Sequence, residues 1–175
     1  GNVLTTGPAN TFVGNFAGNA TIGGKENTFI GNNAGVLNVS GNWNTFTGIV
    51  AGHNNTSGGG NCFYGKQAGV LNNTGGGNNF YGSHAGSNNT AGNLNVAVGH
   101  NAAYISDLGD GNTFIGAGAI PKLASLLKNA AAIGYMSMVM HDDEMILGGV
   151  DTNTNHNVRV GIGLSGEPTG VLNRL

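Results

Sequence analysis

The stretch NTFIGNNAGVLNVSG, residues 27–41, decides the fold, because close copies of it recur along the chain at a fixed interval. Asparagine recurs at every 17th position, eight times in succession: Asn10, Asn27, Asn44, Asn61, Asn78, Asn95, Asn112 and Asn129. A glycine comes four positions after each of the first seven, and an alanine follows three positions later. So regular a period is typical of a solenoid, in which consecutive repeats stack on one another.

The composition shows why stacking is needed. The chain has 34 glycines among 175 residues, and only 8% of its residues are charged, while hydrophobic residues reach 39%. Each glycine fixed in an extended conformation costs roughly 0.5–1 kcal/mol relative to alanine. A folded state must recover that free energy through a regular, cooperative arrangement, which stacked repeats provide.

One aromatic position supplies the predicted core of the repeats. The predicted core residues are Phe12, Phe29, Phe46, Phe63, Phe80 and Phe114, and Ala97 takes this place in one further unit. Coils stacked about 4.8 Å apart would bring the rings into one continuous ladder. Each buried phenylalanine would contribute roughly 1.5–3 kcal/mol to the stability of the fold. One large residue per coil is therefore enough to form the core.

We therefore predict an all-β fold, a flattened parallel β-roll of 17-residue coils, with no helical period between residues 1 and 119. In each coil NTFIG is expected to form a first strand, and the AGVLN type of segment a weaker second strand. Glycine and asparagine are expected to supply the left-handed turn conformations that other residues resist.

The position after each phenylalanine points to the other face of its strand, because side chains alternate along a strand. This column is largely apolar and consists of Val13, Ile30, Thr47, Tyr64, Tyr81, Val98 and Ile115. A thin coil cannot cover both faces, so we expect another copy of the chain to cover the second one. This column, or the alanine column, is expected at the subunit contacts.

The repeat pattern changes after Gly116, and we place a boundary near residue 120. Residues 1–120 are predicted to form the roll, and residues 121–175 a short irregular connector that ends it. The connector allows one or two helical turns between residues 121 and 129. The sequence NAAAIG, residues 129–134, then predicts a strand one residue out of register. The chain starts at Gly1 without methionine, and we expect an upstream region.

The segment NAAAIG resembles the N-S-V-A-I-G repeat of trimeric autotransporter adhesin heads, the YadA-like family. The sequence NVRVGIGLSGEPTGVLNRL, residues 157–175, is similar to the junction in bacterial and phage-like tail fibres that precedes a self-cleaving intramolecular chaperone. The resemblance implies a left-handed roll, a parallel homotrimeric rod and an extracellular, cell-surface or virion location. The repeat is longer than the typical head repeat of that family.

Other motifs do not predict chemistry. The pattern G-x-G-x-x-G at Gly161, Gly163 and Gly166 lacks a strand–helix unit around it, and Gln67 replaces the Ser or Thr of a phosphate loop at residues 60–66. The histidines and acidic residues show no metal-ligand spacing, and Cys62 has no partner set for catalysis. We predict no enzyme activity, cofactor, metal or nucleic-acid partner, and no membrane insertion by this fragment.

Four residues depart from the repeat template where packing does not require them: Trp43, His53, His84 and Tyr104. They are the candidate ligand-binding residues of an adhesive segment, with a glycan or a protein receptor as the expected partner. The alternative is a structural spacer in a tail fibre. A minor alternative is ice binding, because Thr11, Thr28, Thr45 and Thr113 share a column that Cys62, Asn79 and Val96 interrupt.

Overall fold

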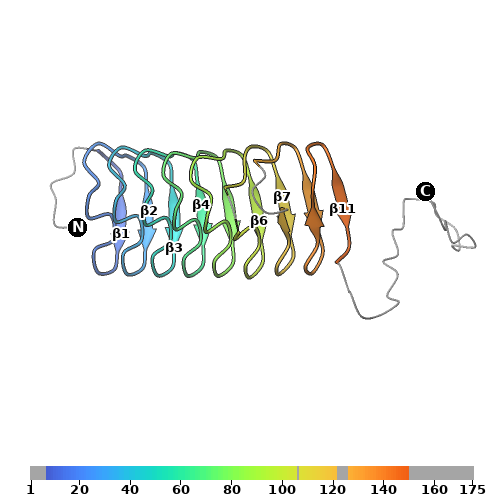
Figure 1. Cartoon of the computed structure of the whole chain (residues 1–175). Helices are drawn as coiled ribbons and strands as arrows, with labels where there is room; N and C mark the ends of the chain where they lie inside the picture. Colours follow the sequence, from blue (N-terminus) through green and yellow to red (C-terminus); the bar gives the residue numbers. More distant parts are fainter. Residues whose placement is uncertain (1–6, 106, 122–125, 150–175) are drawn as a thin grey trace, which may run out of the picture.

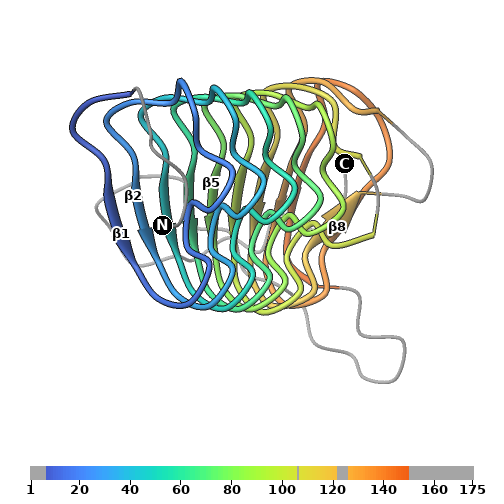
Figure 2. The ribbon, with the colours of Figure 1, turned by 90° about the vertical axis from the view of Figure 1, so that its left-hand side faces the viewer.

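The chain forms a parallel β-solenoid. The computed structural model describes residues 7–105, 107–121 and 126–149, which contain strands and turns and no helix. Nine strands form one sheet in the order β1-β2-β3-β4-β5-β6-β7-β9-β11, every pair parallel, and β8 pairs with β10. Figure 1 shows the stacked coils side on, and Figure 2 shows that the main sheet forms one flattened side of each coil.

The strands are short, and all but two have three residues. Their bounds are β1 Thr11–Val13, β2 Thr28–Ile30, β3 Thr45–Thr47, β4 Cys62–Tyr64, β5 Asn79–Tyr81, β6 Val96–Val98, β7 Thr113–Ile115, β8 Ile120–Pro121, β9 Ala131–Ile133, β10 Met138–Val139 and β11 Met145–Leu147. From β1 to β7 each residue pairs with its equivalent in the next repeat, as Phe46 does with Phe63. The sequence period is therefore the coil length.

The phenylalanine ladder is confirmed. Neighbouring rings from Phe12 to Phe80 are stacked, with centroids 4.8–5.1 Å apart. Phe29, Phe46, Phe63, Phe80 and Phe114 are fully buried, and Phe12 packs half-buried against the same core. The alanine column, Ala17 to Ala119, is buried beside the rings. The alternative placement of these alanines at subunit contacts is therefore wrong.

In the coils of β1 to β5 a glycine makes room for the ring of that coil, whereas Ile120 holds this position in the coil of Phe114. A Cβ atom on Gly35 would lie 2.6 Å from the ring of Phe29, and Gly69 stands in the same relation to Phe63. In the coil of β6 both partners change together, because Ala97 replaces the phenylalanine and the buried Ala103 replaces the glycine. The exchange shows that ring and glycine form one packing unit.

The second strand that we predicted in each coil is absent from the described residues of the coils of β1 to β6, whereas β8 and β10 occupy this position in the coils of β7 and β9. The AGVLN segment, residues 34–38, is a series of turns, and the corresponding segments of the neighbouring coils are turns as well. The reason is that this side of the coil is held by buried asparagine side chains in addition to backbone bonds.

The first asparagine ladder runs along the start of the strands. In each of six steps from Asn10 to Asn112, the side-chain oxygen of one asparagine accepts the backbone N–H of the next at 2.9 Å. The side-chain amide of Asn44 donates to the carbonyl of Gly58 at 2.8 Å, and its equivalents do likewise. Asn27 to Asn112 are buried within the coils.

The second ladder, which the sequence pattern did not reveal to us, lies on the irregular side of each coil and consists of Asn38, Asn55, Asn72 and Asn89. Each amide after the first donates to the side-chain oxygen of the preceding rung at 2.7–2.9 Å, as Asn55 does to Asn38. All four also donate to the carbonyl of a glycine that follows in the same turn. The interior is thus half aromatic and half amide, which is how a roll with so few large apolar residues stays closed.

The prediction that glycine and asparagine fill the left-handed turns was wrong in part. Three columns of residues have φ between 53° and 71°, and two of them carry many residues other than glycine, including Phe16, Val50, Trp43, Leu94 and Met136. This conformation costs residues other than glycine roughly 1–2 kcal/mol. From the second coil on, the backbone N–H of each residue in these two columns donates to a carbonyl of the preceding coil, as Val50 does to Asn32 at 2.9 Å. These repeated bonds stabilise the strained turns.

The sheet continues past residue 120, where we expected the roll to end. Strand β9 pairs with β7 so that Thr113 faces Ala131, which confirms the predicted one-residue shift, and β11 pairs with β9 after a shorter coil. As a result Asn129 lies exposed on the surface, and Ala130 takes the buried ladder position and donates its N–H to Asn112. Of the predicted helical turns between residues 121 and 129, residues 122–125 lie outside the described residues, and residues 121 and 126–129 are not helical. Residues 150–175 also lie outside the described residues.

Candidate functional site

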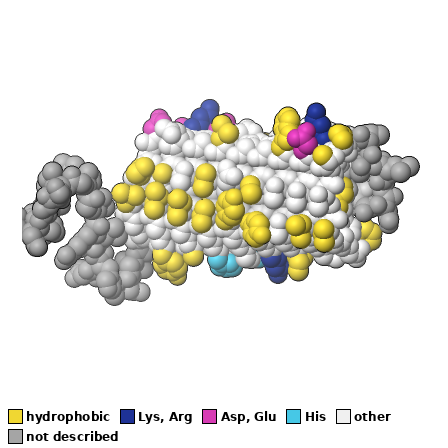
Figure 3. Space-filling model, turned by 180° about the vertical axis from the view of Figure 1, so that it is seen from behind, with side chains coloured by type: hydrophobic (Ala, Val, Ile, Leu, Met, Phe, Trp, Pro, Cys, Tyr) yellow, Lys and Arg dark blue, Asp and Glu magenta, His cyan; other side chains and the backbone are white. Residues whose placement is uncertain are grey.

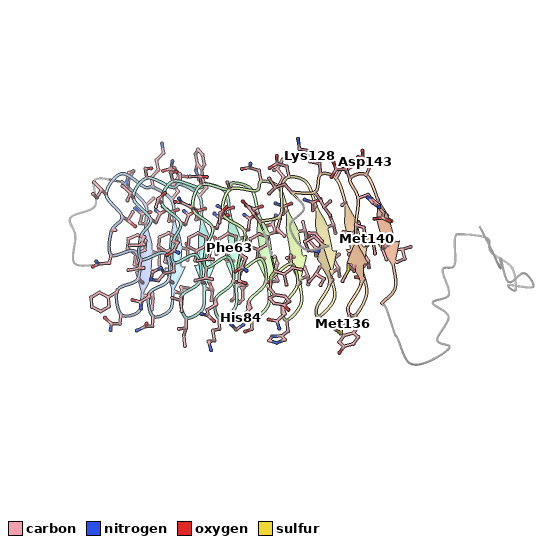
Figure 4. The ribbon with its side chains drawn as sticks, viewed as in Figure 1. Phe63, His84, Lys128, Met136, Met140 and Asp143 are labelled. Carbon is pink, nitrogen blue, oxygen red and sulfur yellow. The ribbon has the colours of Figure 1, made fainter. Side chains whose placement is uncertain are left out.

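Three surfaces of the rod present side chains in regular columns. The outer sheet face carries the first and third residue of each main-sheet strand. The upper edge carries the left-handed residues that precede each strand, among them Trp43 and Asp143. The lower edge carries the residue pairs that follow the strands, among them His84 and Met136. Figure 4 places Lys128 and Asp143 on the upper edge, His84 and Met136 on the lower edge, and Phe63 inside.

The outer sheet face carries no charged residue from β1 to β11, and its first-residue column is mostly half-buried. Its third-residue column includes Ile30, Tyr64, Tyr81, Val98 and Ile115, all exposed, which confirms that this column points away from the core. The rings of Tyr64 and Tyr81 stack with centroids 6.3 Å apart. Figure 3 shows a row of hydrophobic side chains along the rod, with charged side chains gathered mainly along one long edge.

Cys62 lies on this face in the first-residue column. Its Sγ is 3.1 Å from the hydroxyl oxygen of Tyr81 on the neighbouring strand. The contact with the Cys62 thiol raises the pKa of the Tyr81 hydroxyl. Within the described residues no hydrogen bond joins this pair to a histidine or a carboxylate, so it lacks the base that nucleophilic chemistry needs.

Trp43 lies on the upper edge and is 59% exposed. Its indole Nε1 donates to the carboxylate of Glu26 in the preceding coil at 2.9 Å, and the Lys25 ammonium lies 6.0 Å from the ring centroid. The indole is therefore oriented by charged neighbours, and one face of its ring is near a cation. This small charged cluster is on the opposite edge from His84.

His53 lies half-buried on the irregular side of the third coil, where its Nδ1 is 2.6 Å from the side-chain oxygen of Asn54. Tyr104 occupies the same column three coils further along the rod. At about 4.8 Å per coil, this separation is too large for the two side chains to share one small ligand.

His84 and Tyr104 both lie near the part of the lower edge where its column pattern is interrupted. The rings of His84 and His100 meet edge-on, with centroids 6.2 Å apart. Beyond them is a hollow of about 210 Å³, walled by His100, Asn101, Tyr104, Tyr135 and Met136. We call this feature the lower-edge hollow.

The floor of the lower-edge hollow is made by Ala117 and Gly118, with Ile120 beside them. Bulky pairs stand in the same columns on both sides, namely His100 with Asn101 and Tyr135 with Met136. One coil with two small residues between two coils with large ones leaves a notch in the edge.

The four predicted ligand-binding residues are thus not one site. Trp43 lies on the upper edge and His53 on the irregular side of the coil, so the two residues are apart from each other. Both belong to an earlier coil than the residues of the lower-edge hollow. Tyr104 lines the hollow, and His84 lies next to it through its contact with His100.

The sequence prediction missed His100, Tyr135 and Met136 as members of this site. The signal was present, because Ala117 and Gly118 are the smallest pair in their two columns. In the predicted register, in which Thr113 pairs with Ala131, this small pair lies between His100 with Asn101 and Tyr135 with Met136.

Asp107 and Asp110 accept hydrogen bonds from turns of the preceding coil. Burial raises the pKa of the Asp107 carboxyl, but hydrogen bonds from the hydroxyl and backbone of Thr90 and from the backbone of Ala91 outweigh it and hold the pKa below its usual range. Hydrogen bonds from Asn93 lower the pKa of Asp110 in the same way. These carboxylates stabilise the chain's own turns.

The described residues contain no group of three or more histidine, cysteine, aspartate or glutamate side chains that could hold a metal ion. Over the same ranges there is also no helix with the length and apolarity to cross a membrane. The chain matches no protein-family model, no curated protein and no solved structure.

Proposed function

We propose that the chain is a rod-like segment of a non-enzymatic, homotrimeric fibre that attaches to a cell surface from outside the cell. The observation that carries the proposal is the outer sheet face, which is flat, uncharged and lined by exposed Ile, Val and Tyr side chains along the described coils. An apolar stripe of this length on a rod is typical of a contact surface between proteins.

The size of the outer sheet face favours more than two chains. The face is nine strands long, with about 4.8 Å between strands, and three residues wide, with about 3.3 Å per residue. Its area is therefore roughly 400 Å². A stable pairwise interface buries about 800 Å² on each partner. A simple face-to-face pair would therefore be weak, whereas in a trimer around one axis each chain contacts two neighbours and buries surface beside the face as well.

The trimer is tested by light scattering on the full chain. We expect about three times the monomer mass of 17.5 kDa at micromolar concentration. Ile115→Lys, on the outer sheet face, should shift the mass toward the monomer. Ile49→Lys is the matched control, because Ile49 is an exposed isoleucine of the lower edge. A monomeric wild-type chain, or equal dissociation by both variants, would remove the proposal of this interface.

Attachment is tested with the same proteins, labelled and incubated with bacterial and host cells. We expect the wild-type chain to adhere and the dissociated variant to adhere less, because identical weak sites gain avidity in a trimer. A stable trimer that binds no cell surface would support the spacer function instead. Thermal hysteresis of the wild-type solution would support ice binding by the column that contains Thr11, Thr28 and Thr45.

A further inference from the structure

We infer that the lower-edge hollow is a binding site for a single ring of a neutral sugar, such as an uncharged terminal residue of a surface glycan. This site rests on the proposed attachment function and adds to it the place of binding and the chemical class of the ligand.

The shape of the edge singles out this position. Each described residue of the left-handed lower-edge column has φ between 53° and 68°, and Gly118 is the only glycine among them. At the other positions the column carries larger side chains in spite of the strain. The residue with the lowest strain and no side chain therefore stands at the floor of the hollow, between Asn101 and Met136.

The size of the space limits the ligand. The walls belong to coils two steps apart, which corresponds to about 9–10 Å along the rod. The volume of about 210 Å³ is below the roughly 300–1,000 Å³ of clefts that enclose drug-sized ligands. It is large enough for one ring of a sugar and too small to enclose a larger ligand.

The chemistry of the walls suits a sugar ring. Tyr135 is 72% exposed and Tyr104 is 41% exposed, so both present ring surface and a hydroxyl to solvent. Asn101 adds an amide with donors and an acceptor, and His100 adds an imidazole. Aromatic surface combined with a few neutral hydrogen-bonding groups suits a ring that is apolar on its faces and carries hydroxyls at its rim.

The distribution of charge favours a neutral ligand. Lys66 is the only Lys, Arg, Asp or Glu in the two lower-edge columns over the described coils, and it lies two coils before His100. The site therefore has no fixed cation to pair with a sialic acid, a sulfated sugar or a phosphate. A neutral glycan is favoured over an acidic one.

Such a shallow site should bind one sugar weakly, with a dissociation constant on the order of 1 mM, which corresponds to about 4 kcal/mol. Three copies on one rod can raise the apparent affinity by about 10²–10⁴ where the target presents several glycans within reach. Adhesion by the rod is thus compatible with a poor affinity for the free sugar.

The experiment uses the full chain, labelled and applied to an array of neutral and acidic glycans. Ala117→Trp fills the hollow and Tyr135→Ala removes a wall. Asn32→Trp is the matched control, because Asn32 lies in the same column as Ala117 but five coils earlier, away from the hollow. Thermal melting by circular dichroism checks that each variant is folded.

We expect the wild-type chain and Asn32→Trp to bind the same neutral glycans, and the two hollow variants to lose binding at least tenfold. Absence of neutral-glycan binding by the wild-type chain, binding of acidic glycans alone, or full binding by Ala117→Trp would each overturn the inference. Cell adhesion measured in parallel separates the two proposals. If Ala117→Trp adheres to cells as well as the wild-type chain, the hollow is not the binding site, but the proposed attachment function stands. If the wild-type chain binds neutral glycans but does not adhere to cells, the binding site stands and the attachment function does not.

Discussion

The seven coils that begin at β1 to β7 differ from the two that begin at β9 and β11. In the first group the strands recur at the constant period of the sequence, and buried asparagines link the rungs. In the second group the sheet continues, but Ala131 follows Thr113 after one extra residue, and Met145 follows Ala131 after a shortened coil. There Ala130 and Glu144 take the ladder position.

The difference shows that the pairing of the strands does not depend on the asparagine ladder. Strand pairing needs only three residues per coil and tolerates changes in coil length. From Asn10 to Asn95 each ladder asparagine also donates to the carbonyl of a glycine 14 residues later, as Asn61 does to Gly75, whereas Asn112 donates to Leu127 in the lengthened coil. In the short coil that follows Ala130, the residue at that distance is Glu144, which already precedes the next strand. The polar half of the core therefore tolerates one extra residue at Asn112 but does not continue into the short coil.

The largest expected effect comes from a charge in the phenylalanine ladder. Phe63→Asp should prevent folding, because an unpaired carboxylate would lie among fully buried rings. Ile146→Asp, in the same column of the last described coil, should be tolerated better because Ile146 is only half-buried. Thermal melting by circular dichroism measures both. A cooperative melt of Phe63→Asp at the wild-type temperature would rule out the inward ladder.

The ring–glycine unit is tested by a double-mutant cycle. Phe63→Ala should cost about 3–5 kcal/mol. Gly69→Ala should cost about 1–3 kcal/mol, because the new Cβ would meet the Phe63 ring. The double variant copies the native pair of Ala97 and Ala103, so its loss of unfolding free energy should be smaller than the sum of the two. The unfolding free energies are measured by denaturant unfolding. If the losses of the two single variants add up in the double variant, Ala103 does not compensate for Ala97 in the coil of β6.

The ladder itself is tested at two asparagines that the sequence makes equivalent. Asn61→Ala should cost about 2–5 kcal/mol, because the buried N–H of Asn78 loses its acceptor and Gly75 loses a donor. Asn129→Ala should cost about 1 kcal/mol or less, because the exposed side chain of Asn129 donates to Asp143 at the surface. Equal losses of unfolding free energy for Asn61→Ala and Asn129→Ala would contradict the conclusion that the ladder does not include Asn129.

The smallest effect is expected from acid. The folded pKa of Asp107 lies below its unfolded value, so its stabilising contribution is present above about pH 4 and is lost as the pH falls through the folded pKa. Asp107→Asn should therefore lower the melting temperature slightly near neutral pH and have less effect in strong acid. Melting curves across this range check the sign. A variant that shows its largest destabilisation in acid would contradict it.

Much of this fold could be predicted from the sequence, since the columns of Phe12, Gly14 and Ala17 and their equivalents fix coil length, strand position and inward face. The second ladder was missed because Asn38 and Asn55 lie in segments rich in Asn, Ser and Gly, and such residues are typical of exposed turns. Asn129 was misplaced because a one-residue insertion left the period of asparagines intact while it shifted the backbone. The one-residue shift of β9 was predicted, but the contrast in side-chain size along the lower edge was not, so only Tyr104 among the walls of the hollow was anticipated.

The coil-to-coil hydrogen bonds also set how the rod should respond to force. These bonds join equivalent residues of successive repeats and run along the rod, so tension between its two ends loads the outermost coil before the next one. A released 17-residue coil can extend to about 56–61 Å, compared with the roughly 5 Å that it occupies when stacked. Pulling one rod should thus give a series of near-equal steps of about 50–56 Å, and each step would dissipate work while the remaining coils hold.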